Sequence, residues 1–183
     1  MVTRLILLGI LAHSKKPIHG YEIKQVLKRW AVGEYANISY GSIYYNLEKM
    51  EKEGLVQSKT VRDSKRPERK LYTITNKGRK EFVRLLRKNY FEIEKIFFKF
   101  DVGVGFMPAL PKKDVLEALN RRIKYVENMI EMHRKVRDKI EKTAPFFAVA
   151  ILDHHLIHWE AERKWLINLK EEVEKREKFE NWL

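Results

Sequence analysis

The residues best suited to chemistry lie between positions 37 and 72, where polar, aromatic and basic side chains occur together. Ser42, Tyr45 and Lys49 fall on one face of a helix that we predict to begin at the N-cap residue Ser39. Hydroxyl, phenol and ammonium groups on such a face can bind base edges in the major groove of DNA. Cations that can fix position on phosphates accompany them: Lys16, Lys24, Lys65, Arg66, Arg69 and Lys70.

Three more residues of this segment are candidate DNA contacts, and each also has a purely structural interpretation. Gly41 lacks a side chain, so backbone amides at the helix start can approach a phosphate, or it is a simple turn residue. Tyr44 either contacts DNA or packs in the core, and Ser39 also caps the helix. The cations near position 66 either bind phosphates or belong to a solvated hairpin. Their concentration together with Lys49 favours phosphate binding.

One helix and two strands must position these side chains. Ile43, Leu47 and Met50 recur on the opposite helix face and predict a buried side, and Gly54 is placed to end the helix in a left-handed conformation. Residues 55–62 and 69–74 are rich in Val, Thr, Leu and Tyr, which predicts two strands, and residues 63–67 suit a hairpin tip. This outline is that of a winged helix.

The positive charge is concentrated in the N-terminal half of the chain. The formal net charge is +13; residues 1–100 hold 22 Lys and Arg against 10 Asp and Glu, whereas residues 101–183 hold 16 against 15. A one-sided excess is expected of a polyanion-binding module joined to a neutral module with another task. We therefore predict a DNA-binding domain with a linking helix at residues 1–100, and a helical dimerisation and effector domain at residues 101–183.

The chain resembles the PadR-type transcriptional regulators. The resemblance rests on four successive motifs: residues 18–23 (IHGYEI), 39–44 (SYGSIY), 47–56 (LEKMEKEGLV) and 66–75 (RPERKLYTIT). It continues through residues 100–111 and along the last helix, so it covers essentially the whole chain. Two positions depart from the pattern, since Tyr45 stands where the family often has proline and Lys65 replaces a common glycine. The resemblance implies repression of a nearby gene or of its own operon, commonly relieved by a small aromatic or drug-like compound.

Helices account for most of the remaining sequence. Predicted helices from about Thr3 to Ser14 and from Gly20 complete the N-terminal module, and Thr75 caps another. We expect an apolar stripe on that helix to link the two modules: Phe82, Leu85, Leu86, Tyr90, Ile93 and Phe97. Residues 101–111 contain two glycines and two prolines among apolar residues, which predicts a packed connector.

Two long helices follow, at about residues 112–142 and 146–180, with apolar residues alternating three and four apart. The second helix has two such seams, and a helix with two seams needs two partners. The preceding helix can cover one seam within the subunit, and we expect a second subunit to cover the other. This second seam, the predicted homodimer interface, comprises Ile151, His154, His158, Ala161 and Trp165.

The same seam carries groups that could bind a small molecule. A candidate pocket for an aromatic effector comprises Met129, Phe146, Phe147, Trp159 and Trp165, although these residues also suit a packed core. His154, His158 and Glu162 lie one helical turn apart, a spacing that can share a metal ion, and His155 lies beside them. Because histidines along a seam can also satisfy one another, we expect neither a metal nor another cofactor.

Other function classes are disfavoured. The chain has no cysteine, which removes disulfides and thiolate sites and fits the cytoplasm, where we expect the protein. No segment has the roughly 20 apolar residues of a membrane helix. Phosphate-loop, dinucleotide and catalytic-triad patterns are lacking, so we expect no enzyme.

The predicted fold class is mostly α with a small β-hairpin wing, in which an N-terminal winged helix-turn-helix precedes a C-terminal α-helical dimerisation module. The predicted function is that of a homodimeric DNA-binding regulator on an inverted-repeat operator. The alternative is a winged helix that binds RNA or a protein partner without sensing a ligand.

Overall fold

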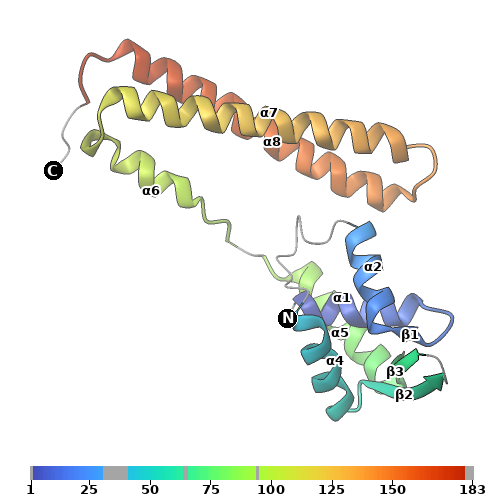
Figure 1. Cartoon of the computed structure of the whole chain (residues 1–183). Helices are drawn as coiled ribbons and strands as arrows, with labels where there is room; N and C mark the ends of the chain where they lie inside the picture. The colour runs from blue at the N-terminus through green and yellow to red at the C-terminus, as the bar shows by residue number, and fades with distance from the viewer. Residues whose placement is uncertain (1, 31–40, 64–65, 94, 180–183) are drawn as a thin grey trace. The chain divides into compact units, whose positions relative to one another are not determined.

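The computed structural model describes residues 2–30, 41–63, 66–93 and 95–179, and it divides into two compact units, Met1–Lys95 and Ile96–Leu183 (Figure 1). The first unit contains α1 (Val2–His13), β1 (Ile18–His19), α2 (Gly20–Arg29), α4 (Ser42–Lys52), β2 (Val56–Asp63), β3 (Arg66–Ile74) and α5 (Asn76–Phe91). The second contains α6 (Lys99–Gly105), the 3-10 helix η1 (Met107–Ala109), α7 (Lys112–Ile140) and α8 (Phe146–Lys175). The predicted mostly helical fold class with a small sheet is confirmed.

The sheet is antiparallel with strand order β1-β3-β2. Ile18 of β1 pairs with Tyr72, a strand that the sequence did not reveal because two residues are too few to show alternation. The hairpin strands are longer than predicted: Asp63 pairs with Arg66, so Arg66 and Pro67 lie within β3 and not at the tip. Backbone pairing sets these ends, whereas the prediction followed side-chain type. Ser64 and Lys65 lie outside the described residues.

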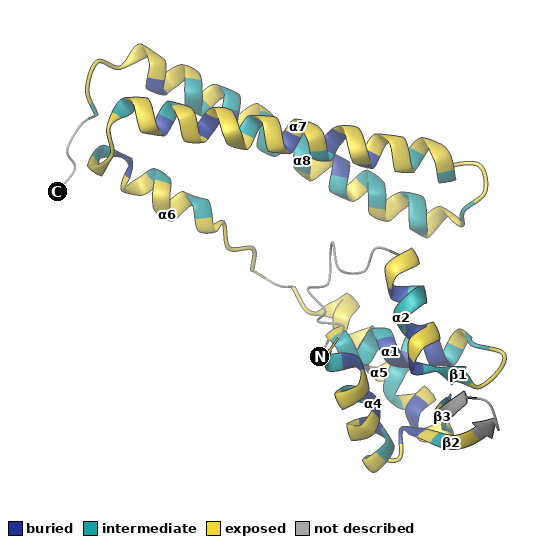
Figure 2. Ribbon diagram, in the orientation of Figure 1, coloured by how far each residue is buried: buried dark blue, intermediate teal, exposed yellow. Residues whose placement is uncertain are grey.

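The core of the first unit gathers the apolar faces of its helices, dark blue in Figure 2, with residues of the sheet. Leu7 and Leu8 of α1 are fully buried, as are Ile43 and Leu47 of α4 and Ile23 of α2. In α4, the buried residues Ile43 and Leu47 are positions at which the helical periodicity predicted burial. The core therefore fixes which face of α4 points outward.

A tight junction joins α4, the wing and α5. Gly54 has φ of 72°, which confirms the predicted left-handed helix end. The Thr75 hydroxyl donates to the Gly54 carbonyl at 2.8 Å, and the Thr75 amide donates to the Leu55 carbonyl at 3.0 Å. Thr75 also accepts from the Gly78 amide at 3.0 Å, which confirms it as the cap of α5. The end of α4, the start of the wing and the start of α5 are therefore joined by these hydrogen bonds.

The stripe predicted to continue along α5 to Phe97 is wrong. The helix ends at Phe91, Tyr90 and Phe97 are exposed, and Ile93 is 100% exposed. Leu85 is buried because α5 packs against α1. The covering helix α1 begins at Val2, close to this contact. Beyond it, no described element of the first unit covers the helix, so further turns would bury little apolar surface.

The second unit is built on the antiparallel pair α7 and α8 (Figure 1). Its core contains Leu119, Val126 and Ile130 of α7 with Leu156 and Leu166 of α8. Residues 101–111, predicted as a packed connector, instead form most of α6 and η1, although Met107 packs in the core as expected. None of the described helices is long and apolar enough to span a membrane.

The interruption of the α7 apolar pattern at His133 and Arg137 serves the pairing with α8. His133 is buried and its Nδ1 donates to the Met129 carbonyl at 2.7 Å. The Arg137 guanidinium donates to the Asp153 carboxylate at 2.6 Å, which raises the pKa of the guanidinium and ties the two helices together.

Replacing Gly78 with alanine tests the tight junction. A Cβ there would lie 2.0 Å from the Leu55 carbonyl oxygen, and neither backbone segment can move without breaking the Thr75 bonds. Gly78→Ala should lower the free energy of unfolding by about 3 kcal/mol, the upper end of typical overpacking costs. Thermal melts followed by circular dichroism measure this loss.

Gly105→Ala is the matched control, because no atom lies within 4 Å of its added Cβ. This variant should melt at the wild-type temperature or slightly above it, since alanine is the better helix former. Equal melting temperatures for the two variants would contradict the close approach of α5 to Leu55.

Candidate nucleic-acid interface

The helix α4 presents its polar face because its apolar face is held in the core. Gly41 occupies the N-cap position in a helical conformation with φ of −66°, and Ser39, the predicted cap, lies outside the described residues. Tyr45 is 66% exposed and Lys49 is exposed on the same side. Ser42 is half-buried at the first turn. The three predicted base-reading residues therefore share an outward face.

Tyr44 was predicted either to contact DNA or to pack in the core, and its side chain is partly packed and partly exposed. Its ring packs against α2, since a Cβ on Gly20 would lie 2.5 Å from the ring. The side chain is nevertheless 48% exposed. Gly20 is thus needed for the close approach of α2 to α4, and the Tyr44 ring is only partly covered by that contact.

A carboxylate of α4 links this helix to the wing. Glu51 accepts a hydrogen bond from the Ser58 hydroxyl of β2 at 2.5 Å and forms an ion pair with Lys70 of β3 at 3.6 Å. The Ser58 hydroxyl, assisted by Lys70, lowers the pKa of Glu51 below its ordinary value. The predicted phosphate contact Lys70 is therefore shared with an internal partner.

The other predicted cations come from three different parts of the first unit. Arg69 is exposed on β3, and Lys16 is exposed in the turn before β1. Lys24 is half-buried on α2. Arg66 starts β3, but its side chain and the whole of Lys65 lie outside the described residues.

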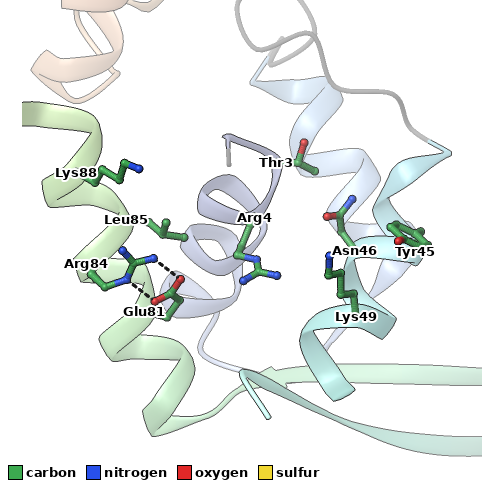
Figure 3. Close-up of a pocket in the computed structure, with 9 residues that line it drawn as sticks. All are labelled: Thr3, Arg4, Tyr45, Asn46, Lys49, Glu81, Arg84, Leu85 and Lys88. Atoms are coloured by element: carbon green, nitrogen blue, oxygen red, sulfur yellow. Dashed lines mark hydrogen bonds and ion pairs between the residues drawn. The ribbon is translucent and has the colours of Figure 1, made fainter. Parts of the chain in front are cut away.

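Three cations beside α4 were missed by the sequence analysis. Arg4 of α1 and Arg84 and Lys88 of α5 line a hollow of about 360 Å³ together with residues of α4 (Figure 3). Arg84 and Lys88 lie four residues apart, a spacing visible in the sequence. Arg4 is brought to them only by the packing of α1 against α5.

The seam predicted to form a dimer interface is exposed in the single chain. Its five members, Ile151, His154, His158, Ala161 and Trp165, are all exposed. The Nε2 atoms of His154 and His158 lie 3.0 Å apart, so these histidines satisfy each other as expected. Among the described residues, no group of three or more His, Cys, Asp or Glu could hold a metal ion.

The predicted effector residues do not all gather in one chain. Trp159 and Trp165 line a mostly apolar pocket of about 840 Å³, with His158 and with Phe97, Phe98 and Phe100. Phe100 meets Trp165 edge to face with ring centroids 5.9 Å apart. The sequence analysis did not predict the lining residues between positions 97 and 104, because it placed the pocket along the two long helices.

Phe146, Phe147 and Met129 do not line this pocket. Phe146 precedes Trp159 by 13 residues, which is about 20 Å along a helix. Phe146 and Phe147 contact each other instead, with ring centroids 5.8 Å apart, and both are exposed.

The first unit has a helical core that includes the apolar face of α4, an outward polar face on that helix and an antiparallel hairpin, and the second unit has a long helical pair. These are the features of winged-helix transcriptional regulators. Residues 7–84 match the sequence model of the Transcriptional regulator PadR-like family. The Negative transcriptional regulator PadR of Bacillus subtilis (strain 168) is 26% identical over 113 residues, 62% of this chain. That alignment spans 60% of the relative's length.

Solved structures resemble nearly the whole chain. Bacillus subtilis PadR in complex with operator DNA has a TM-score of 0.79 at 20% identity and covers 94% of this chain and 99% of its own. The same protein in complex with p-coumaric acid has a TM-score of 0.76 at 19% identity, covering 96% and 100%. The matched family and these structural neighbours are transcriptional regulators and not enzymes, and residues 7–84 of this chain form a PadR-like domain.

The bridge from α4 to the wing predicts a pH dependence of stability. Because the folded-state pKa of Glu51 lies below the ordinary 4.5, its ionised form stabilises the fold above that pH. The contribution disappears as pH falls through the lowered folded-state pKa. Glu51→Gln should therefore be less stable than wild type at pH 6–8, and the difference should shrink below pH 4.5. Urea unfolding at a series of pH values measures it.

Glu48→Gln is the control, since it removes an equal charge from the exposed face of α4 without contacting Ser58 or Lys70. A stability difference between wild type and Glu51→Gln that stays constant from pH 3 to 8 would contradict the bridge.

Proposed function

We propose that this regulator is a sequence-specific DNA-binding repressor that acts as a homodimer. The observation that carries the proposal is the outward face of α4, on which Tyr45 and Lys49 are exposed, together with the exposed cation Arg69 on β3 of the wing. In this proposal Ser42, Tyr45 and Lys49 enter the major groove and read base edges. The cations of the wing and of α2 bind phosphates and fix the register.

The proposed homodimer is supported by apolar surface that the single chain leaves uncovered. Ile151 and Trp165 on α8 are exposed, and so are Phe91, Ile93 and Phe97. Exposed apolar surface of this extent is typical of an interaction site. A two-fold dimer carries two copies of α4, so its operator is an inverted repeat with half-sites about one helical turn apart.

The proposed effector is a small aromatic compound. The pocket of Trp159, Trp165 and Phe100 offers aromatic faces, with His158 and Glu162 as polar groups at its wall. A relative of similar fold has been solved with p-coumaric acid. A ligand that binds one arrangement of the dimer better than another shifts the population and so changes operator affinity.

Substitutions at the reading face and at the wing should have different effects on DNA binding. Tyr45→Ala should weaken operator binding roughly five- to 150-fold and leave random-duplex binding nearly unchanged, as expected when 1–3 kcal/mol of base discrimination is lost. Arg69→Ala should weaken both duplexes alike and reduce the slope of log affinity against log salt by about 0.9 per subunit. Fluorescence anisotropy with operator and random duplexes at several salt concentrations measures both quantities.

Arg121→Ala, which removes an exposed cation of α7, is the control and should retain wild-type binding. Equal losses on both duplexes from Tyr45→Ala and Arg69→Ala would contradict the assignment of separate reading and anchoring residues.

The effector proposal predicts a coupled response to aromatic acids. A compound that occupies the pocket should change tryptophan fluorescence and release operator DNA over the same concentration range. Trp165→Ala should weaken both responses about tenfold or more, because it removes a wall of the pocket. Phe147→Ala should respond like wild type, since Phe147 lies outside the pocket. A panel in which no compound produces both responses would exclude this pocket as the sensor.

A further inference from the structure

The hollow beside α4 is built from three elements and lies next to the reading face (Figure 3). Thr3 and Arg4 come from α1, and Asn46 and Lys49 come from α4. The buried side chain of Leu85 belongs to the α5 wall. The remaining lining residues are Tyr45, Glu81, Arg84 and Lys88.

The lining is strongly cationic, because four cations face a single carboxylate. Arg84 occupies both oxygens of that carboxylate: its Nε donates to Glu81 Oε2 at 2.7 Å and its Nη2 donates to Oε1 at 2.8 Å. The hydrogen bond from Arg84 lowers the pKa of Glu81, so the pair stays ionised. A guanidinium has five N–H donors, and this fork uses two of them. Glu81 therefore holds Arg84 in place and leaves donors for another anion.

Two of the other three cations are held by carboxylates outside the hollow. Arg4 donates to Glu53 at 2.7 Å, and Lys88 lies 3.2 Å from Glu92, yet neither carboxylate lines the hollow. Lys49 makes no ion pair with any residue that the structure describes. The hollow thus combines positioned cations with unused donors, which is the arrangement that a phosphate oxygen requires.

The position of the hollow indicates which phosphate it would take. A helix with its side chains is about 10–12 Å wide and fills the roughly 12 Å major groove, so a sugar-phosphate strand passes along each flank of the helix. The flank of α4 that lines the hollow carries Asn46 and Lys49. A strand on that flank passes over Arg84 and Lys88.

We propose that this hollow, the phosphate seat, binds a backbone phosphate of DNA when α4 enters the major groove. This inference rests on the proposed function and adds Arg4, Arg84 and Lys88 to the proposed DNA contacts of the first unit. The seat is open and its lysines are exposed, which suits a phosphate carried by a large partner. Free phosphate has the same chemistry, so the test includes it.

Arg84→Gln and Lys88→Gln test the seat in the full-length protein. Each should lower the slope of log affinity against log salt by about 0.9 per bound subunit, on operator and random duplexes alike. At 0.1 M salt, affinity should fall about eightfold for each subunit bound. Using two variants keeps the test valid if one fails to fold, which circular dichroism checks.

Arg87→Gln is the matched control, because it removes the same kind of charge from an exposed residue of α5 that does not line the seat. This variant should keep the wild-type slope. A second measurement titrates inorganic phosphate into wild type and Arg84→Gln at constant ionic strength, with amide chemical shifts as the readout.

The outcomes separate the seat from the proposed function. Wild-type slopes in both seat variants, together with a reduced slope in Arg69→Ala, would overturn the seat and leave DNA binding intact. If phosphate also shifts the amides of α5 only in wild type, the site is one for free anions and the DNA assignment is wrong. Failure of the wild-type protein to bind any duplex would overturn both proposals.

Discussion

The close approach of α5 to the Leu55 carbonyl is the constraint on which the arrangement of the first unit depends. Gly54 reverses the chain after α4, Thr75 donates both to Gly54 and to Leu55, and Gly78 lets the first turn of α5 pack against the same carbonyl. The end of α4, both wing strands and the start of α5 are therefore fixed relative to one another. The outward face of α4, the basic strand β3 and the cationic wall of α5 all take their positions from this junction.

Local signals in the sequence predicted the elements that such signals control. The 3.6-residue period of Ile43, Leu47 and Met50 gave the buried face of α4, and Gly54 and Thr75 marked a helix end and a helix start. Features that depend on tertiary contacts were missed. Strand β1 exists only because β3 lies beside it, and the phosphate seat requires α1 to bring Arg4 against α5. Of the predicted effector residues, Trp159 and Trp165 line one pocket within the chain, whereas Phe146 and Phe147 lie more than three turns away along α8.

The two units of this protein have different physical characters. The excess positive charge belongs to the first 100 residues, and the first unit has a compact core with its cations around α4. The second unit is nearly neutral and has two long helices, one of which exposes an apolar and histidine-rich seam. Long-range attraction to a polyanion and short-range apolar assembly thus reside in separate parts of the chain. Salt affects mainly the first, because apolar burial is not screened by ions.

The Glu51 carboxylate has a mechanical consequence. By contacting Ser58 of β2 and Lys70 of β3 from the last turn of α4, it joins the helix and the wing into one body. Such a body cannot relay a signal by tilting α4 against the wing without first breaking two polar contacts. In the proposed homodimer, a signal that leaves these contacts intact would act on the placement of the whole DNA-binding unit. In that proposal the DNA-binding unit keeps its shape, and the spacing between the two copies of α4 on the DNA changes.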